Sequence, residues 1–484
     1  MINESSEIEK LEIENISFIR SYLKGKNSKN NNYDEEEDYD TSILGTFYRI
    51  MKLSIAMFSS MIISSIRLTL VYTFTQNSNI NFLQSLSTVI PLFVCCSFGV
   101  CYSTSQYFGF NAAVLASRKE YRNLGLSFNK AFLYNLIVSL FLAFLFFFIL
   151  GPLFALMNFN DEVLYNNNIL FKFLGFALPF QFMQFVILKF FFSVRSVGHI
   201  MIGQLIGLFG QVIFQSITIL GFKEITYGTG ISYLLGYVFM FSFNYTFYKL
   251  KNPCPNADIN ITYEETFDSF WEYVKISVPI GFLCFLQIIS FEILPLISII
   301  MGPVAFSAYG VITNSITMIQ MLSEAITTAN NIEINTAIGK NKVSQIKLSL
   351  LVSLVIIMIY TILISFLFIF LAEPFYKLYT KETEVIKIIM DLKYLILIII
   401  ITQNVINLIN EALSCLGENT IPIFNLILFR YLFTIGLSLI FLHYTNLAHF
   451  SLILSFIWGN IATILINAPL LFYKIGTFQI KDLK

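Results

Sequence analysis

Residues 348–372 read LSLLVSLVIIMIYTILISFLFIFLA, a run of 25 residues without a charged side chain. A helix needs about 20 mainly apolar residues to cross the hydrocarbon core of a bilayer, so this run is long enough to span a membrane. Residues 132–150 form a second charge-free run. No stretch alternates in the way that membrane β-strands do. The sequence therefore predicts an all-α polytopic membrane protein.

The composition of the whole chain agrees with this prediction. Hydrophobic residues make up 56% of the 484 positions and charged residues only 12%, whereas soluble domains carry roughly 25%. The formal net charge is zero, which gives no reason to expect a nucleic-acid partner. The six cysteines include no C-x-x-C pair, so we expect buried small apolar residues rather than metal ligands or disulfides.

Apolar segments of similar length recur along the chain and predict twelve transmembrane helices. They lie near residues 50–74, 81–108, 128–151, 168–192, 199–222, 228–249, 270–300, 304–330, 348–372, 388–412, 420–442 and 448–473. Residues 1–43, before the first span, are polar and poor in apolar residues, which predicts a disordered tail. Its charged start predicts no cleavable signal peptide, so the first span is expected to direct insertion.

Basic residues predict the orientation, because short cytoplasmic loops are enriched in Lys and Arg. If the N-terminus lies in the cytoplasm, most of the Lys and Arg residues in the loops fall on the cytoplasmic side. The outer loops then hold only four: Lys223, Lys377, Lys381 and Lys387. Both termini are therefore expected in the cytoplasm, which requires an even number of spans.

Short repeats indicate two related halves. Residues 196–202, after the fourth span, are similar to residues 415–421, after the tenth, at an offset of 219 residues. Halves with six spans each are parallel and related by an axis along the membrane normal. The predicted parts are a cytoplasmic tail (1–43), an N-lobe (44–250), a cytoplasmic linker (251–267), a C-lobe (268–474) and a cytoplasmic C-terminal tail (475–484).

Catalytic and nucleotide-binding motifs are not found. The sequence has no Walker-type loop that would bind ATP and no recognisable pair of nucleophile and base. We therefore expect neither an enzyme nor an ATP-driven pump, and no cofactor.

Ionisable residues inside the predicted spans are the candidates for function, because they are costly in lipid and usually face the interior of a bundle. They are Arg67, Glu292, Glu324 and Arg430, with Glu411 near the end of its span. The polar neighbours of Glu324 fit a wet vestibule as well as a functional role. For Arg430 we favour a structural role, such as a pair with Glu411.

Glu292 is the strongest candidate for a functional residue. It lies deep in the span at 270–300, three residues before Pro295. Proline at that position clashes with the carbonyl of Phe291 and cannot donate to it, so the helix should bend beside the carboxylate. Burial favours the neutral acid and an organic cation favours the ionised form, so Glu292 could exchange a proton for a cation. The alternative is a structural partner of Arg67 or Arg430.

The same span resembles a motif of the multidrug and toxic compound extrusion (MATE) transporters, especially of their eukaryotic branch. Residues 275–279 (KISVP) and 285–294 (FLQIISFEIL) are similar to the family stretch K-x-x-x-P followed by L-E-W-W-x-F-E-I-L. Residues 106–109 (QYFG) resemble the Q-A-Y-G-A signature, and residues 329–339 resemble its counterpart in the second half. The resemblance covers about residues 45–470.

This resemblance implies twelve helices in two homologous six-helix lobes, and export of organic cations or other amphipathic molecules by antiport with H+ or Na+. It places three neutral side chains at pathway positions: Gln287 where the family has a glutamate, Asn314 where it has an acid or Asn, and Gln403 where some members have a glutamate. Glu292 is retained, and Glu333 stands where the family has an arginine. Pro279 matches the family proline, and we expect Pro279 and Pro295 to bend this span.

Three functions are left open by these departures. The first is export of organic cations and xenobiotics. The second is export of organic anions, or flipping of a lipid-linked molecule as in the same superfamily, which an Arg67 facing the cavity would favour. The third is a receptor or scaffold that transports nothing. In each case the expected partners are a small amphipathic molecule and the lipid bilayer, and the chain is expected to be a monomer in the plasma membrane or an endomembrane.

Overall fold

The computed structural model describes residues 42–477 with seven interruptions, at 76–79, 157–159, 252, 255–261, 291–292, 378–381 and 446–448. Nearly all of the described residues are helical, and none of them forms a strand. The predicted all-α fold is therefore confirmed. The predicted disordered tail lies, apart from its last two residues, outside the described part.

The helices form two compact units. The first unit comprises Lys52–Ile293 and Thr317–Ala325, and the second comprises Met1–Met51, Leu294–Ile316 and Ile326–Lys484. The predicted lobes at 44–250 and 268–474 describe a repeat in the sequence, which helix packing does not test. They stay a prediction.

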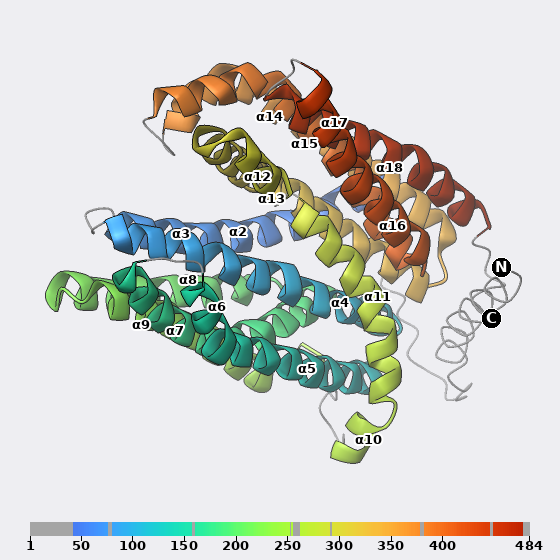
Figure 1. Ribbon diagram of the computed structural model, residues 1–484. Coiled ribbons are helices and arrows are strands. Elements are labelled where there is room, and N and C mark those ends of the chain that lie inside the picture. Colours follow the sequence, from blue (N-terminus) through green and yellow to red (C-terminus); the bar gives the residue numbers. More distant parts are fainter. Residues whose placement is uncertain are drawn as a thin grey trace, which may run out of the picture. The chain divides into compact units, whose positions relative to one another are not determined.

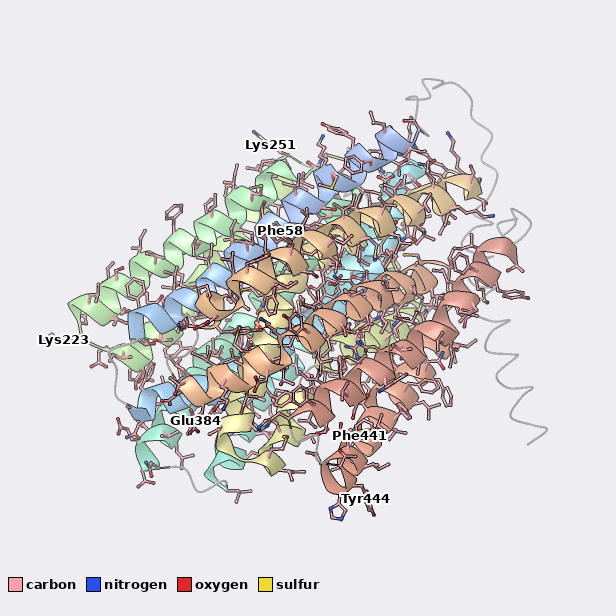
Figure 2. The ribbon with its side chains drawn as sticks, turned by 90° about the horizontal axis from the view of Figure 1, so that it is seen from above. Phe58, Lys223, Lys251, Glu384, Phe441 and Tyr444 are labelled. Carbon is pink, nitrogen blue, oxygen red and sulfur yellow. The ribbon has the colours of Figure 1, made fainter. Side chains whose placement is uncertain are left out.

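Helices of the first unit are continued in three places by π-helical turns. In chain order they are α2 (Ile43–Thr75), α3 (Ile80–Val94), η1 (Cys95–Val100), α4 (Cys101–Ser117), α5 (Tyr121–Phe144), η2 (Leu145–Ile149), α6 (Leu150–Ala155), α7 (Asp161–Ser193), α8 (Gly198–Gln215), η3 (Ser216–Gly221), α9 (Ile225–Leu250), α10 (Tyr263–Phe267) and α11 (Phe270–Ile289) (Figure 1). Lys223 and Lys251 mark the two ends of α9 (Figure 2).

The second unit contains the remaining helices, apart from residues 293 and 317–325, and also the first nine residues of α2 (43–51). They are α12 (Ile293–Ser298), η5 (Ile299–Met301), α13 (Pro303–Gly339), α14 (Val343–Lys377), α15 (Thr383–Cys415), α16 (Thr420–Asn425), η6 (Leu426–Phe433), α17 (Thr434–Tyr444) and α18 (Phe450–Thr477). A ladder of amides joins three of them: Asn425 donates to Asn467 (2.6 Å), and Asn467 donates to Asn410 (2.8 Å). Polar side chains between helices are typical of membrane bundles, where they replace contacts with water.

All twelve predicted spans coincide with helices. Within the described part of the chain, eight stretches are long and apolar enough to cross a membrane. They are Ile43–Arg67, Tyr121–Ala155, Asp161–Ser193, Gly198–Gly221, Phe270–Ile289, Val343–Lys377, Thr420–Tyr444 and Phe450–Thr477. The other four predicted spans fall on α3–α4, α9, α13 and α15, so the count of twelve stays a prediction.

The predicted span at 270–300 falls on two helices of the described chain. Helix α11 ends at Ile289 and α12 begins at Ile293. Pro279 lies inside α11, and Pro295 lies in the first turn of α12. Glu292 lies outside the described residues, so the predicted bend beside its carboxylate stays a prediction.

The segment between α9 and α11 carries a short capped helix. Thr262 caps α10, because its hydroxyl accepts from the backbone N–H of Glu265 while the Glu265 carboxylate accepts from the N–H of Thr262. Arg122 at the start of α5 donates to the same carboxylate at 2.6 Å. This hydrogen bond holds the pKa of Glu265 below its ordinary value.

Close packing of α8 on α9 depends on two glycines. A Cβ atom at Gly207 would lie 2.9 Å from the carbonyl oxygen of Gly236, and one at Gly236 would lie 3.0 Å from the carbonyl of Gly207. Real Cβ atoms essentially never come so close to backbone, so these helices touch only because both residues are glycine. Small residues at helix crossings serve this purpose in membranes.

We predict that Gly207→Ala lowers the thermal unfolding midpoint of the purified protein in detergent, because the added methyl forces α8 and α9 apart at a cost of about 1–3 kcal/mol. Gly436→Ala is the matched control, since no atom lies within 4 Å of its would-be Cβ. Both changes gain about 1 kcal/mol of helix propensity. Equal midpoints for the two variants would contradict the packing argument.

Candidate functional site

The pathway residues predicted from the sequence are divided between the units. Three belong to the first unit: Arg67, Gln287 and Glu324. Two belong to the second: Asn314 and Gln403. Glu292 lies outside the described residues, so its role stays a prediction.

Arg67 is the most completely enclosed of the predicted residues in the first unit, at 2% exposed. Its Nε donates to Oε1 of Gln211 on α8 at 2.9 Å, and the Gln211 amide donates back to the Arg67 carbonyl at 3.0 Å. The guanidinium carbon lies 4.1 Å from the ring centre of Tyr237 on α9, and Nη1 points at the Met240 sulfur at 3.9 Å. Every one of these contacts is with a neutral group.

Space for the Arg67 head group is left by a glycine. A Cβ atom at Gly236 would lie 2.7 Å from Nη2 of Arg67. Because α9 has no side chain there, the guanidinium can lie against its backbone. The crossing of α8 and α9 therefore also forms the wall of the arginine site.

Lys189 is a second buried cation in the first unit, and the sequence reading missed it. Its ammonium donates to Oε1 of Gln106 at 2.6 Å and lies 4.1 Å from the ring centre of Tyr102. Its side chain is 7% exposed. The signal was present, since Lys189 falls inside the span predicted at 168–192, but it is close to the end of that span and resembles a snorkelling lysine.

Between residues 44 and 250, acidic residues lie only at the ends of helices. The four in this stretch are Glu120, Asp161, Glu162 and Glu224. Two of them precede α5 and α9 as N-caps, and the other two lie in the first turn of α7. The helix interiors of this stretch therefore carry bases but no carboxylate.

The other two predicted residues of the first unit are less enclosed. Gln287 on α11 is 7% exposed, and its amide nitrogen has no hydrogen-bond partner among the described residues. Glu324 on α13 is half-buried. Its position fits the wet vestibule and the functional role equally.

In the second unit, a carboxylate is buried among amides. Asn331 on α13 donates to Glu411 on α15, which is 9% exposed. The neighbouring Asn330 accepts from Ser349 and Ser353 on α14 at 2.7 and 3.0 Å. These contacts join α13 to both α14 and α15.

Gln403 and Asn314 differ in burial. Gln403 is 1% exposed and donates to Asn407 at 2.7 Å, while its own oxygen has no hydrogen-bond partner in the described chain. Asn314 is exposed on α13. Gln403 is therefore placed as an interior polar group, whereas Asn314 is placed on a surface of its unit.

Arg430 lies in the π-helical segment η6 and is fully buried. Its guanidinium carbon is 4.9 Å from the ring centre of Phe456 on α18. A widened helical turn of this kind is frequent at functional sites. This contact lies between η6 and α18, and the structural role favoured from the sequence stays a prediction.

A salt bridge joins the start of α2 to α13 within the second unit. Arg49 Nε lies 3.2 Å from the carboxylate of Glu333, whose side chain is 0% exposed. Arg49 also donates to Thr46 at 3.2 Å, and Gln345 on α14 donates to the same hydroxyl at 2.7 Å. Glu333 stands at the position where MATE members carry arginine, and here α2 supplies the base.

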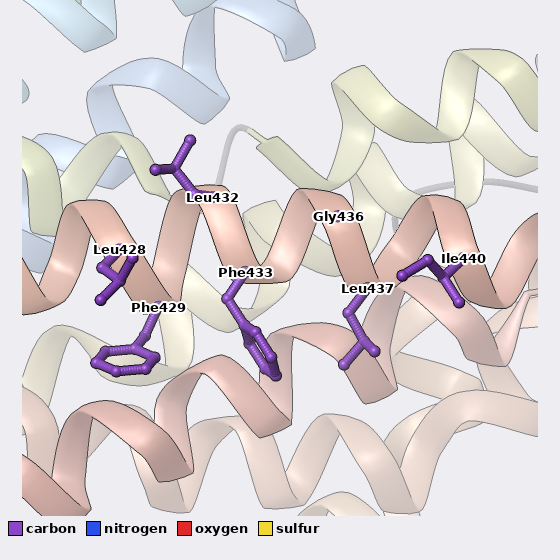
Figure 3. A pocket seen from close by; sticks show the side chains of 7 residues that line it. All are labelled: Leu428, Phe429, Leu432, Phe433, Gly436, Leu437 and Ile440. Atoms are coloured by element: carbon purple, nitrogen blue, oxygen red, sulfur yellow. The ribbon is translucent and has the colours of Figure 1, made fainter.

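An apolar depression of about 420 Å³ runs along η6 and α17 (Figure 3). It is lined by Leu428, Phe429, Leu432, Phe433, Gly436, Leu437 and Ile440. Several of these side chains are exposed, and none is ionisable. A surface of this kind suits lipid chains rather than a charged solute.

Metal ligands do not gather in the described residues, where no group of three or more His, Cys, Asp or Glu could hold an ion. The six cysteines are free thiols, three of them buried and three half-buried. Their burial agrees with the expectation of small apolar residues.

We predict that Glu333→Gln lowers the free energy of unfolding by about 2–3 kcal/mol, because it leaves the Arg49 guanidinium beside a neutral group in a largely buried site. Equilibrium unfolding in SDS mixed micelles measures this. Glu373→Gln makes the same change in an exposed pair with Lys377 and is expected to have no measurable effect. The exchange Arg49→Glu with Glu333→Arg should recover part of the loss, and a double variant worse than either single one would contradict the pairing.

Comparisons with known proteins support the resemblance inferred from the sequence. The MatE family model matches residues 279–440. A search of curated proteins found no match. Among solved structures, the eukaryotic MATE transporter AtDTX14 is similar with a TM-score of 0.82 and 16% sequence identity, over 91% of this chain and 99% of that one.

Two further solved structures are similar over most of their length. A MATE protein in the bent conformation has a TM-score of 0.78 at 14% identity, covering 91% of this chain and 97% of that one. A MOP superfamily transporter from Pyrococcus furiosus has 0.76 at 15% identity, covering 89% and 96%, and is described by the reverse polarity of its binding pocket. The resemblance inferred from the sequence is thus confirmed: residues 279–440 match MatE, and the chain has the fold of the MATE transporters.

Proposed function

We propose that this chain is a secondary transporter that exports amphipathic organic molecules by antiport with H+ or Na+. The observation that supports this best is the MATE fold over 91% of the chain. Polar and ionisable groups buried inside its helices add support. Such groups are expensive in a bilayer and usually mark the pathway of a substrate or ion.

The coupling proposal depends on the acids of the second half. In the sequence, Glu292 falls between α11 and α12 and three residues before Pro295, where a bent helix could present a carboxylate to a solute. A carboxylate that releases its proton when a cation arrives would couple the two movements. Export of organic cations therefore remains the first candidate.

Other parts of the proposal follow from the transporter fold. An enzymatic activity is not proposed, because the proteins that share this fold are transporters. The apolar helices predict an integral membrane protein. Cytoplasmic termini, a monomeric state and the choice of membrane stay predictions.

We predict that Glu292→Gln reduces efflux of ethidium, an organic cation, from proteoliposomes at least tenfold under an imposed pH gradient. The amide cannot release a proton, so exchange stops while expression and the unfolding midpoint stay near wild type. Parallel runs with a Na+ gradient identify the coupling ion.

Glu384→Gln is the matched control, because Glu384 is exposed in the first turn of α15. Its efflux should equal that of wild type. Unchanged efflux in Glu292→Gln would remove the proposed coupling role. If the wild-type protein moved neither ethidium nor an organic anion under either gradient, the receptor or scaffold reading would replace the transporter.

A further inference from the structure

We infer that the first unit holds a binding site for the carboxylate of a soluble organic acid, centred on Arg67. The inference rests on the proposed transport function and adds organic acids, bound in the first unit, to the organic cations proposed to couple through Glu292. It begins from a charge that the surrounding protein leaves uncompensated.

Among the described residues, no carboxylate contacts the buried guanidinium of Arg67. Its partners Gln211, Tyr237 and Met240 are all neutral. A buried guanidinium that lacks a counter-ion is destabilising, and a purely structural role would be filled better by an apolar or neutral side chain. The energetic cost of burying this charge is explained if an anion binds to Arg67 during part of the transport cycle.

One nitrogen of the Arg67 guanidinium is left without a hydrogen bond. Gln211 holds Nε, Nη1 points at the Met240 sulfur, and the Tyr237 ring covers one face. Nη2 has no hydrogen-bond partner among the described residues, although it is buried. Its N–H groups can donate to a carboxylate, and charge-assisted hydrogen bonds of this kind are the strong ones.

Further unpaired donors lie on the adjacent helices. Gln215 is one turn beyond Gln211 on the same face of α8, fully buried, and neither polar atom of its amide has a partner in the described chain. Gln184 on α7 is also fully buried with its amide unpaired. Native proteins seldom leave so many buried amides without partners, which fits a polar ligand or water in this bundle.

Two tyrosine rings beside Arg67, and a phenylalanine that packs against both, suggest what the rest of the ligand is like. Phe93 lies 5.7 Å from Tyr233 and 6.1 Å from Tyr237 between ring centres, and the two tyrosines are 6.0 Å apart. Aromatic surfaces accept flat apolar groups by stacking. The site therefore suits an acid with an aromatic body, its carboxylate on the arginine.

Within residues 44–250, the charges inside the helices have the same sign. Lys189 adds a second buried positive charge, and the acids of residues 44–250 stay at the helix ends. Low-dielectric walls strengthen the field of such charges. An organic cation would be repelled here, whereas an anion is attracted. Because Arg67 is only 2% exposed, the helices around it must separate before a ligand enters.

The test is binding to the purified full-length chain in detergent, read by fluorescence anisotropy with carboxyfluorescein as the anionic aromatic probe and ethidium as the cationic one. We expect wild type to bind carboxyfluorescein, with benzoate competing. Arg67→Gln should weaken this binding at least tenfold, and Arg67→Lys should weaken it less. Lys172→Gln, which removes one charge from an exposed position on α7, should bind as wild type does.

Two results would overturn the inference: equal affinity of wild type and Arg67→Gln, or wild type that binds ethidium but not carboxyfluorescein. Competition by phosphatidylglycerol but not by benzoate would overturn the choice of a soluble acid. If Arg67→Gln does not fold, the charge preference of wild type and the Arg67→Lys affinity still decide. Binding needs no transport, so a failed efflux assay rejects the proposed function without touching this result.

Discussion

The bilayer offers no water to polar groups, and this constraint governs the structure. Every backbone N–H and C=O in the hydrocarbon must be paired within its own segment, which leaves helices as the solution for a chain with long apolar runs. Side-chain amides then join helices to each other, as Asn410, Asn425 and Asn467 do in the second unit. Where side chains would hold helices apart, glycines such as Gly207 and Gly236 permit contact. Both devices replace the hydrophobic driving force that a soluble core would use.

The same constraint explains which parts of the fold could be predicted from the sequence. A charge-free run such as residues 348–372 has few alternatives to a spanning helix, so helix positions followed from hydropathy alone. The end of α11 at Ile289 was harder to predict, because a proline indicates that a helix is disturbed without saying whether it bends or stops. Packing such as α8 on α9 involves residues about 30 positions apart, and no local pattern announces it.

The candidate site was predictable only in part, for a related reason. A charge in the middle of a span is conspicuous, so Arg67 was found at once. Lys189 was overlooked because a lysine near a helix end can extend its ammonium to the interface, and only the structure shows it bound to Gln106 and enclosed. The partnership of Arg49 with Glu333 joins residues 284 positions apart, which sequence spacing does not reveal. Burial and partner identity are properties of the packed bundle.

Arg49 and Arg67 lie on the same helix, and the contrast between them argues for separate roles. Arg49 meets the buried carboxylate of Glu333, so its charge is neutralised within the protein and its interaction can serve stability. Arg67 meets an amide, a ring and a thioether, none of which carries a negative charge. The carboxylate of Glu333 compensates the charge of Arg49 within the protein. For Arg67, the proposed organic anion would supply the negative charge that its described neighbours lack, and this difference in partners separates the roles of the two arginines.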